Sequence, residues 1–411
     1  MKIAVISRSD SNGGAAVVSR RLTEALREQG QEATLLVLEK QTDLPYVVKA
    51  NYPLLSKVVF LLDRLDIFIH DGFSRTNLFK TDSGRFGLPL WRHPVVREAD
   101  AIIINWVNQG MMSLKGVEKI CREGKKVVWT MHDMWNLTGI CHHSMECRRF
   151  EGTCCDCPLL GKGGGRHDLA WKTQRRKKRL YDRGEITFVA VSHWLLDKAR
   201  QSSLLGERKV ELIANPYKIK EPGERTRGAR RRILFSAATI DNWIKGLDTF
   251  REAVRILAET RPDLAEDAEI AFAGNVKNPD SLLGFALPTI ELGYTSDEDG
   301  LLEHFSHSDV IVNSSFFESF GLILMEGQAY GCVPVAFDRG GQGDIIDHQQ
   351  TGYLAPWSDN PRQRAENLAA GIVWALENRN EEMIERMRSS VKGKFGYEHI
   401  ARRYMEVLGR P

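Results

Sequence analysis

The sequence lacks several features that would mark other classes of protein. No apolar run in its 411 residues is long enough to span a bilayer, and the apolar stretch at residues 3–6 is too short for a secretory signal. We therefore expect a cytoplasmic protein. A large excess of one charge is also missing, because 57 Lys and Arg residues stand against 54 Asp and Glu. The near balance gives no global field that would favour nucleic acid.

Two local features leave membrane contact open. Basic residues cluster at 175–179 and 225–232, and such runs are typical of solvated helix faces or linkers, with contact to anionic lipid headgroups as the alternative. Residues 54–69 are apolar on one face, with four charged residues between the apolar positions. We expect this helix to face the core, and peripheral contact with a membrane surface is the alternative.

The distribution of apolar runs predicts two α/β domains. Short β-branched runs recur with helical segments between them, as expected for strands buried on both faces of a parallel sheet. In the first half these runs are residues 3–6, 33–38, 101–104, 126–129 and 188–191. In the second half they are residues 233–236, 269–273, 310–312 and 333–336. The pattern predicts two doubly wound, Rossmann-like domains that face each other across a cleft, comprising residues 1–215 and 216–392.

The strongest motif contains two carboxylates, Glu318 and Glu326, separated by seven residues. Glu318 lies just before a predicted helix, in a loop at the carboxyl end of a strand, where open α/β sheets bind ligands. Glu326 falls inside that apolar helix, where a charge requires a partner, and a carboxylate suits vicinal hydroxyls such as those of ribose. The amides of Phe320, Gly321 and Leu322 begin the helix and can face a phosphate. The alternative is structural, with Glu318 as a helix cap and Glu326 in a salt bridge.

A second candidate is the loop that contains Gly13 and Gly14, between the first predicted strand and helix. Paired glycines let the backbone approach a ligand closely, and a helix N-terminus favours an anion. The loop does not have the G-x-G-x-x-G pattern and no acidic ribose partner is evident, so a dinucleotide site is not expected. The alternative is a tight turn that requires glycine.

A His-Asp pair, His132 and Asp133, follows the predicted strand at residues 126–129. A side chain at this strand end faces the cleft in such folds, and the histidine can donate to a sugar hydroxyl or stabilise developing charge. Asp133 is a candidate contact to a second ligand in the cleft, the acceptor of a transferred group. The alternative is a hydrogen-bonded histidine that closes the strand.

Five of the seven cysteines fall between residues 141 and 157. Four of them have the spacing C-x5-C-x6-C-x2-C, which is typical of a structural zinc site with four thiolates. These four are Cys141, Cys147, Cys154 and Cys157, in a predicted insert at residues 139–160. Reduced structural thiols or a pair of disulfides are the alternatives. We expect no catalytic metal, because no carboxylate cluster of the D-x-D type belongs to the candidate site.

The segment from Glu318 to Glu326 resembles the E-x7-E motif of a large family of retaining glycosyltransferases, family four, which contains sucrose synthases and mannosyltransferases. The resemblance covers nearly the whole chain, and the N-terminal motifs are similar to those of bacterial polysaccharide-assembly transferases of the colanic-acid type. It implies the GT-B fold, a nucleotide sugar held by the C-terminal domain, and no metal requirement. It also implies that a final helix, within residues 393–411, returns to the N-terminal domain.

The resemblance assigns roles to individual residues. Glu326 matches the acid that binds the donor ribose, Glu318 the acid near the hydroxyls of the transferred sugar, and Lys245 the lysine that neutralises the donor diphosphate. His132 matches a histidine that contacts the transferred sugar, and residues 340–344, GGQGD, resemble a glycine-glycine loop followed by an acid. One departure concerns an arginine five or six residues before the lysine, where this chain has isoleucine and threonine. The lysine then acts with backbone amides, or another basic residue substitutes.

These features predict a retaining glycosyltransferase that moves a sugar from a nucleotide-diphosphate sugar to a saccharide or lipid-linked saccharide, in cell-surface polysaccharide assembly. Two alternatives stay open. One is an epimerase or hydrolase of sugar nucleotides with the same fold. The other is a non-catalytic, zinc-containing interaction module that binds nucleic acid through the basic runs. Near-neutral charge and the lack of interleaved aromatic residues count against nucleic acid as a partner.

Overall fold

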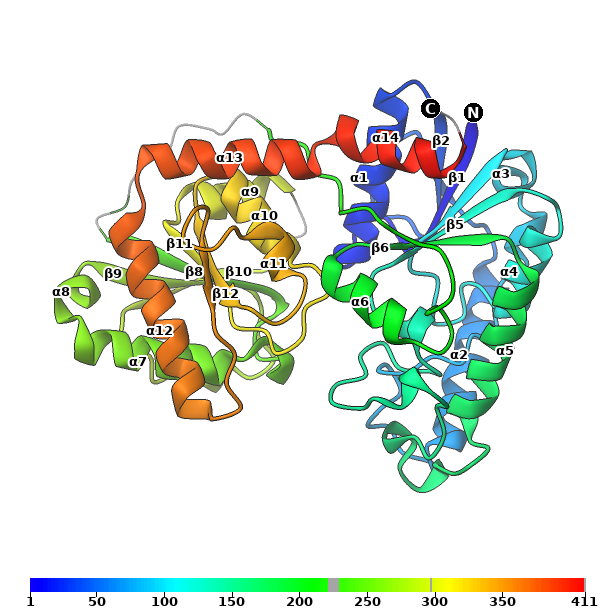
Figure 1. Cartoon of the computed structure of the whole chain (residues 1–411), viewed down its shortest axis with the longest axis horizontal. Helices are drawn as coiled ribbons and strands as arrows, with labels where there is room; N and C mark the ends of the chain where they lie inside the picture. Colours follow the sequence, from blue (N-terminus) through cyan, green and yellow to red (C-terminus); the bar gives the residue numbers. More distant parts are fainter. Residues whose placement is uncertain (221–227, 229, 296–297, 410–411) are drawn as a thin grey trace. The chain divides into compact units, whose positions relative to one another are not determined.

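The computed structural model describes residues 1–220, 228, 230–295 and 298–409 (Figure 1). Contacts between Cα atoms divide the chain into two compact units. Unit 1 comprises Met1–Pro216 and Tyr397–Pro411, and unit 2 comprises Tyr217–Gly396. The predicted basic run at residues 225–232 lies partly outside the described residues.

Unit 1 is built on a seven-stranded parallel sheet with the order β3-β2-β1-β4-β5-β6-β7. Its strands are β1 (Lys2–Ser9), β2 (Glu32–Glu39), β3 (Val47–Lys49), β4 (Ala101–Ile104), β5 (Lys126–Met131), β6 (Ile186–Ala190) and β7 (Val210–Leu212). The chain adds β2 and β3 on one side of β1 and then continues on the other side with β4. The strand order therefore reverses between β1 and β4, which is where doubly wound sheets bind ligands.

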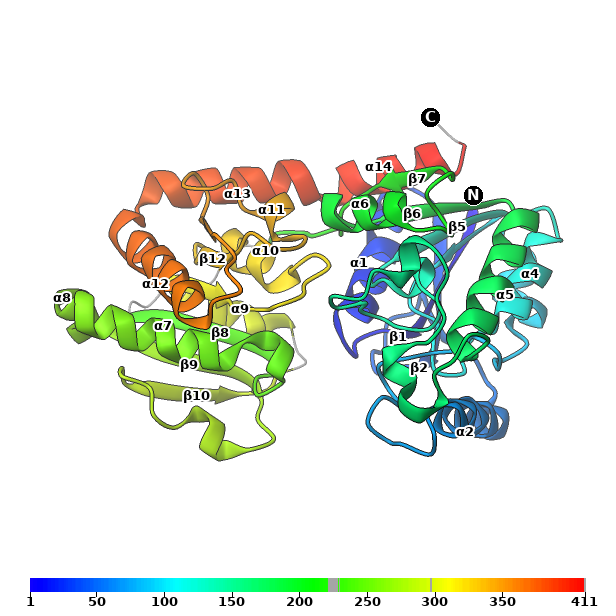
Figure 2. The same cartoon turned by 60° about the horizontal axis from the view of Figure 1, so that its bottom comes forward.

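Seven α-helices belong to the described part of unit 1. They are α1 (Gly14–Glu28), α2 (Pro53–His70), α3 (Pro94–Glu98), α4 (Leu114–Cys121), α5 (Leu169–Arg183), α6 (His193–Gln201) and α14 (Tyr397–Val407). Short 3-10 turns are η1 (Leu90–Arg92), η2 (Trp135–Leu137), η3 (Arg149–Glu151) and η4 (Pro158–Gly163). Helix α14 lies beside α1 (Figures 1 and 2), and its Tyr404 hydroxyl is 2.8 Å from Thr130 Oγ1 of β5. The end of the chain thus completes the core of unit 1.

Unit 2 repeats the architecture with a six-stranded parallel sheet in the order β10-β9-β8-β11-β12-β13. Its strands are β8 (Arg231–Thr239), β9 (Ala268–Asn275), β10 (Thr289–Gly293), β11 (Val310–Asn313), β12 (Val333–Phe337) and β13 (Tyr353–Ala355). Its helices are α7 (Leu247–Thr260), α8 (Pro262–Glu266), α9 (Glu298–Ser306), α10 (Leu322–Ala329), α11 (Gln342–Ile345), α12 (Pro361–Asn378) and α13 (Glu381–Phe395), with 3-10 turns η5 (Trp243–Lys245) and η6 (Pro279–Leu282). The predicted fold class, two Rossmann-like α/β domains, is confirmed.

One local expectation needs correction, and another holds with one exception. The expectation that residues 54–69 face the core is wrong, because the apolar side chains of α2 are largely exposed and three of its four charged residues, Asp63, Arg64 and Asp66, are buried. The basic run at 175–179 lies on α5, where most of its side chains reach the surface but Lys177 is fully buried. The buried Arg64 and Asp66 of α2 and the buried Lys177 have hydrogen-bond or ion-pair partners from other segments of the chain.

Candidate functional site

In unit 2, the structure brings Lys245 and Glu318 together. Lys245 closes η5 after β8, and Glu318 lies in the loop that follows β11. Lys245 Nζ donates to Glu318 Oε2 at 3.0 Å, and the two side chains are 29% and 20% exposed. The amide of Phe316 also donates to the carbonyl of Ile244 at 2.8 Å, so backbone contacts hold the two segments together. The pair is therefore a partly exposed ion pair at the carboxyl end of the sheet.

Gly246 makes this arrangement possible. It has φ +67° and ψ 33°, and a Cβ at this position would lie 2.2 Å from the carbonyl oxygen of Ser314. The Ser314 hydroxyl is placed to donate to the carbonyls of Lys245 at 2.8 Å and Gly246 at 3.0 Å. Only glycine combines the left-handed conformation with this close approach. The glycine after Lys245 thus sets the distance between η5 and the loop that carries Glu318.

The predicted glycine-glycine loop supports Glu318. The amide of Gly341 donates to the carbonyl of Glu318 at 3.0 Å. A Cβ on Gly340 would lie 2.4 Å from that same carbonyl oxygen, and one on Gly341 would lie 2.3 Å from the carbonyl of Ser319. Two loops that are distant in sequence therefore pack backbone to backbone behind Glu318.

Helix α10 begins directly after this loop. Gly321 is its N-cap, with φ 103°, and no side chain forms a capping hydrogen bond there. The alternative in which Glu318 caps the helix is thus not observed, because Glu318 pairs with Lys245 instead. Phe320 is buried against Phe395, while Glu326 is 6% exposed on the buried side of α10. The first amides of α10, including that of Leu322, form the positive end of the helix dipole, and no capping side chain accepts their hydrogen bonds.

The arginine missing before Lys245 has a structural explanation. Ile240 is fully buried in the hydrophobic core of unit 2, so this position carries no cation. Two other arginines, which the sequence analysis did not single out, stack beside the Glu318 loop. The Arg339 guanidinium lies 4.9 Å from the centre of the Phe317 ring, and that of Arg364 lies 5.0 Å from the Phe316 ring. Arg339 directly precedes the glycine-glycine loop, which is the signal that would have identified it.

In unit 1, Gly13 and Gly14 lie at the carboxyl end of β1. Gly13 is the N-cap of α1 with φ +86°, and open space surrounds the position of its absent Cβ. Both glycines are exposed. Asp10, fully buried beneath the loop, accepts hydrogen bonds from the amides of Gln41 and Thr42 at 2.9 Å. The start of the loop is thus held by Asp10, and the space beside Gly13 is open, as close approach to a ligand requires.

His132 follows β5 and pairs with a residue at the end of β4. Its Nε2 is 2.7 Å from Asn105 Oδ1, so Nε2 donates and Nδ1 carries a lone pair in this orientation of the amide. Burial lowers the pKa of His132 to about 4, against a smaller upward effect of Asp133. The imidazole is therefore neutral near pH 7. It can accept a proton or a hydrogen bond at Nδ1.

Asp133 has both carboxylate oxygens engaged. Its Oδ2 is 2.8 Å from His142 Nδ1 and accepts from Trp106 Nε1 at 3.0 Å, while Oδ1 accepts from the amide of Trp135 at 2.7 Å. Burial opposes ionisation of Asp133, but the charge and hydrogen bond of His142, the charge of His143 and the hydrogen bond from the Trp135 amide lower its pKa to about 2. Burial lowers the pKa of His142, but the Asp133 carboxylate outweighs it and the net direction is upward. Asp133 thus holds the segment after His132 in place.

The cysteine-rich insert converges on one small cavity. A cavity of about 20 Å³ is lined by five cysteines, Cys141, Cys147, Cys154, Cys155 and Cys157. The amide of Gly139 donates to Cys154 Sγ at 3.2 Å. Burial raises the pKa of Cys141 to about 12 and that of Cys154 to about 11. Across the described residues, no group of three or more His, Cys, Asp or Glu side chains is placed to hold a metal ion. As they stand, these thiols do not form a ligand set, and the four-thiolate zinc site stays a prediction.

Lys177 of α5 is buried beside this insert. Its Nζ donates to the carbonyls of Trp135 and Thr138, the latter at 3.1 Å, and lies 3.6 Å from the centre of the Trp135 ring. Burial lowers the pKa of Lys177 to about 7, against smaller opposing effects led by Cys141. This lysine fixes the segment that follows Asp133 onto α5.

A family model described as glycosyl transferases group 1 matches residues 218–393, which includes Lys245, Glu318 and Glu326. These residues are similar to a glycosyl transferases group 1 domain. The match coincides closely with unit 2, so the Lys245–Glu318 pair belongs to the matched domain. A group 1 domain, together with the relatives below, supports transferase activity.

Two curated relatives extend this result. A putative colanic acid biosynthesis glycosyl transferase, WcaC, of Escherichia coli is 23% identical over 347 residues, which cover 79% of this chain and 80% of the relative. An uncharacterized glycosyltransferase of Methanocaldococcus jannaschii is 26% identical over 179 residues, which cover 39% of this chain and only 44% of the relative.

Among solved structures, HepE of Anabaena in complex with UDP and glucose superposes with a TM-score of 0.60 at 15% identity, covering 99% of each chain. This similarity supports the fold alone. The architecture is that of the GT-B glycosyltransferases, as predicted.

Proposed function

We propose that this chain is a cytoplasmic, retaining glycosyltransferase of family four that transfers a sugar from a nucleotide-diphosphate sugar to a saccharide or lipid-linked saccharide acceptor in polysaccharide assembly. The group 1 domain and the similarity to a colanic acid transferase support this proposal. The UDP and UDP-glucose complexes of HepE support a nucleotide-sugar donor. The observation that carries the proposal is the Lys245–Glu318 pair beside the N-terminus of α10.

The donor diphosphate competes with Glu318 for Lys245. Without donor, the ammonium and the carboxylate neutralise each other at 3.0 Å. When a diphosphate binds, the ammonium group of Lys245 turns from Glu318 to pair with the phosphate, and the amides at the start of α10 supply further hydrogen-bond donors. Fixed positive charge that faces a leaving diphosphate stabilises the charge that develops in the transition state. Glu318, released from the lysine, is then free to accept hydrogen bonds from the hydroxyls of the transferred sugar.

Glu326 and the N-terminal unit complete the proposed roles. Glu326 accepts hydrogen bonds from the vicinal hydroxyls of the donor ribose. In unit 1, neutral His132 contacts the transferred sugar, Asp133 orients the segment toward the acceptor, and Gly13 and Gly14 let the backbone approach the donor. The acceptor hydroxyl attacks on the face that the leaving group vacates, which retains the anomeric configuration, and the departing phosphate takes its proton. The proposal includes no cofactor in catalysis and no nucleic acid.

A donor panel tests this proposal with the full chain. Thermal unfolding is measured with UDP-, GDP- and ADP-sugars, because a ligand at one hundred times its Kd stabilises the native state by about 2.7 kcal/mol. We expect one donor to raise the Tm of the wild type and to have no effect on Glu326→Ala. Glu382→Ala, an exposed glutamate of α13, is the matched control and keeps the full shift. An unchanged donor shift in Glu326→Ala would overturn the site assignment.

The stereochemical part needs product analysis. We expect a glycoside product with the same anomeric configuration as the donor. Donor consumed equally with and without acceptor would favour the hydrolase alternative, and a product isomeric with the donor would favour the epimerase.

A further inference from the structure

Helix α2 exposes its apolar side chains to solvent. Leu54 is 77% exposed and Leu61 is 66% exposed. The exposed large apolar residues of this helix are Leu54, Leu55, Val58, Leu61, Leu62, Leu65 and Ile69. Beyond its C-terminus, Phe73 and Phe79 are exposed as well. An apolar surface this continuous is unusual for a monomer and marks a binding surface.

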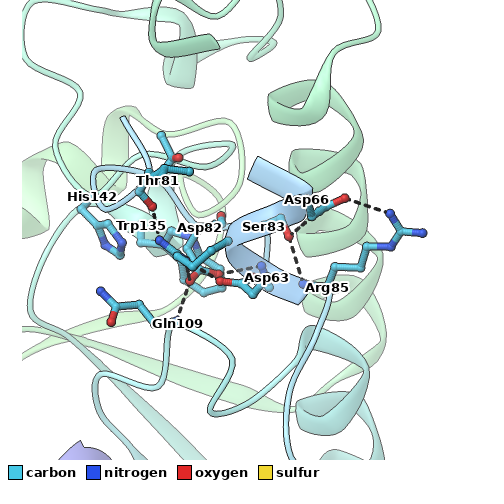
Figure 3. A network of polar contacts seen from close by, with 12 residues as sticks. Asp63, Asp66, Thr81, Asp82, Ser83, Arg85, Gln109, Trp135 and His142 are labelled. Atoms are coloured by element: carbon cyan, nitrogen blue, oxygen red, sulfur yellow. Dashed lines mark hydrogen bonds and ion pairs between the residues drawn. The ribbon is translucent and has the colours of Figure 1, made fainter. Parts of the chain in front are cut away.

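Three of the four charged residues of α2, namely Asp63, Arg64 and Asp66, are buried, and Figure 3 shows Asp63 and Asp66 in the network of polar contacts beneath the helix. Arg64 pairs with the neighbouring Asp63 and with Asp82 Oδ2 at 3.1 Å. The Asp82 carboxylate also accepts from the amide of Gln109 at 2.6 Å. These groups fix α2 with its polar face inward, so the helix cannot rotate to bury its leucines without breaking buried ion pairs.

A second set of contacts holds Asp66, in the same C-terminal half of the helix. Asp66 Oδ1 accepts from Arg85 Nη1 at 3.0 Å, and Asp66 Oδ2 accepts from the Ser83 hydroxyl at 3.0 Å (Figure 3). With Asp63, Arg64 and Asp66 all buried, Lys57 is the one Lys, Arg, Asp or Glu of α2 that is exposed. The exposed face is thus apolar with a single positive charge.

A basic groove adjoins the C-terminal end of α2. It has a volume of about 390 Å³, and it is lined by His70, the last residue of α2, by Arg85, and by residues at the start and along one side of α5. The α5 lining includes Trp171, Lys172, Arg175, Arg176 and Arg179. Its described lining contains no carboxylate. The groove is suited to an anionic group, and Trp171 is a residue type found at membrane interfaces.

We propose that α2 and this groove dock unit 1 on an anionic lipid bilayer. The apolar face of α2 enters the boundary between headgroups and acyl chains, parallel to the surface, and the groove binds lipid phosphate. An apolar helix face beside clustered Arg and Lys is the combination that interfacial helices use. A two-fold dimer through the same face would bring two basic grooves close together, so charge favours the bilayer over a second copy. This inference goes beyond sugar transfer, and its test uses no donor.

The test is co-sedimentation of the full chain with vesicles of phosphatidylcholine, with or without phosphatidylglycerol. We expect binding that increases with phosphatidylglycerol and falls with salt. The variant Leu54→Ser/Leu61→Ser/Leu65→Ser should bind at least about tenfold more weakly. Because these side chains are exposed, its Tm should equal that of the wild type. The matched control is Leu283→Ser, an equally exposed leucine of unit 2 (66%).

The groove is tested separately. Arg175→Ala and Arg179→Ala should each weaken binding to phosphatidylglycerol vesicles about fivefold, while Arg200→Ala on α6 should not. Failure of the wild type to bind any vesicle, or equal binding by the leucine variant, would overturn the proposal. A dimer in light scattering that the leucine variant converts to a monomer, without vesicle binding, would identify a second copy as the occupant and overturn it as well. Each of these outcomes leaves the donor panel unaffected.

Discussion

Replacing Gly246 by alanine tests whether the backbone sets the geometry of the Lys245–Glu318 pair. Gly246 has φ +67°, and an added Cβ would lie 2.2 Å from the Ser314 carbonyl oxygen and 3.1 Å from Phe316 Cε1. The left-handed conformation costs about 1–2 kcal/mol for a residue with a Cβ, and the enforced shift of the Ser314 loop adds about 1–3 kcal/mol. We expect Gly246→Ala to destabilise unit 2 by about 3 kcal/mol in total, which corresponds to a Tm lower by about 6–12 °C for a domain of this size.

Gly284 provides the matched control. It lies in the same unit with φ +79° and has nothing within 4 Å of a Cβ position, so Gly284→Ala carries only the conformational cost. The measurement is thermal and urea unfolding of both variants, followed by titration with the donor found in the panel. We expect Gly246→Ala to lose more stability than Gly284→Ala and also to bind donor more weakly. Equal loss of stability in the two variants, with donor affinity intact in both, would refute the role assigned to Gly246.

Three further predictions concern the charges and the thiols. Lys245→Ala should lower kcat by about a hundredfold or more and donor affinity by less, because the lysine charge acts mainly on the leaving group. Single-turnover kinetics measure the effect on the chemical step. A change confined to KM would contradict this prediction. Asp133→Asn should be about 2 kcal/mol less stable than the wild type at pH 7, because the folded-state pKa of Asp133 is about 2 against an ordinary 3.8. Stability of this origin is present above about pH 4 and is lost as pH falls toward 2, so urea unfolding should show the difference between the two proteins fading over that window. Metal analysis should find about one zinc per chain, and less than half an equivalent would count against the four-thiolate site.

The strands predicted from the sequence lie in the interior of the two sheets, whereas the strands that were not predicted lie at the sheet edges. The predicted runs, such as residues 101–104 and 310–312, became central strands buried on both faces, which is what a continuous apolar run encodes. The missed strands are β3, β7, β10 and β13, and each lies at an edge of its sheet. Edge strands are short and partly exposed, so β10 alternates in burial and β7 is only half-buried throughout. Their pairing depends on a neighbour that the local sequence does not show.

The candidate site was predictable where a motif determines local geometry. The glycines at 246, 340 and 341 each occupy a position where a Cβ would overlap a carbonyl, which is why glycine stands there in the sequence. Other features depend on contacts between distant segments. Arg64 and Asp66 of α2 are buried because they pair with Asp82 and Arg85, whereas the periodicity of the apolar residues alone predicts that the opposite face of the helix is buried. The stacking of Arg339 near the Glu318 loop likewise depends on a neighbouring strand end.

If the proposed function is right, unit 2 binds the diphosphate of a nucleotide sugar. A crystal structure of the full chain with the donor that raises the Tm tests it most directly. We predict the diphosphate at Lys245 and at the first amides of α10, with the ribose on Glu326 and the Lys245–Glu318 ion pair broken. A diphosphate bound elsewhere, with that ion pair intact, would contradict the account.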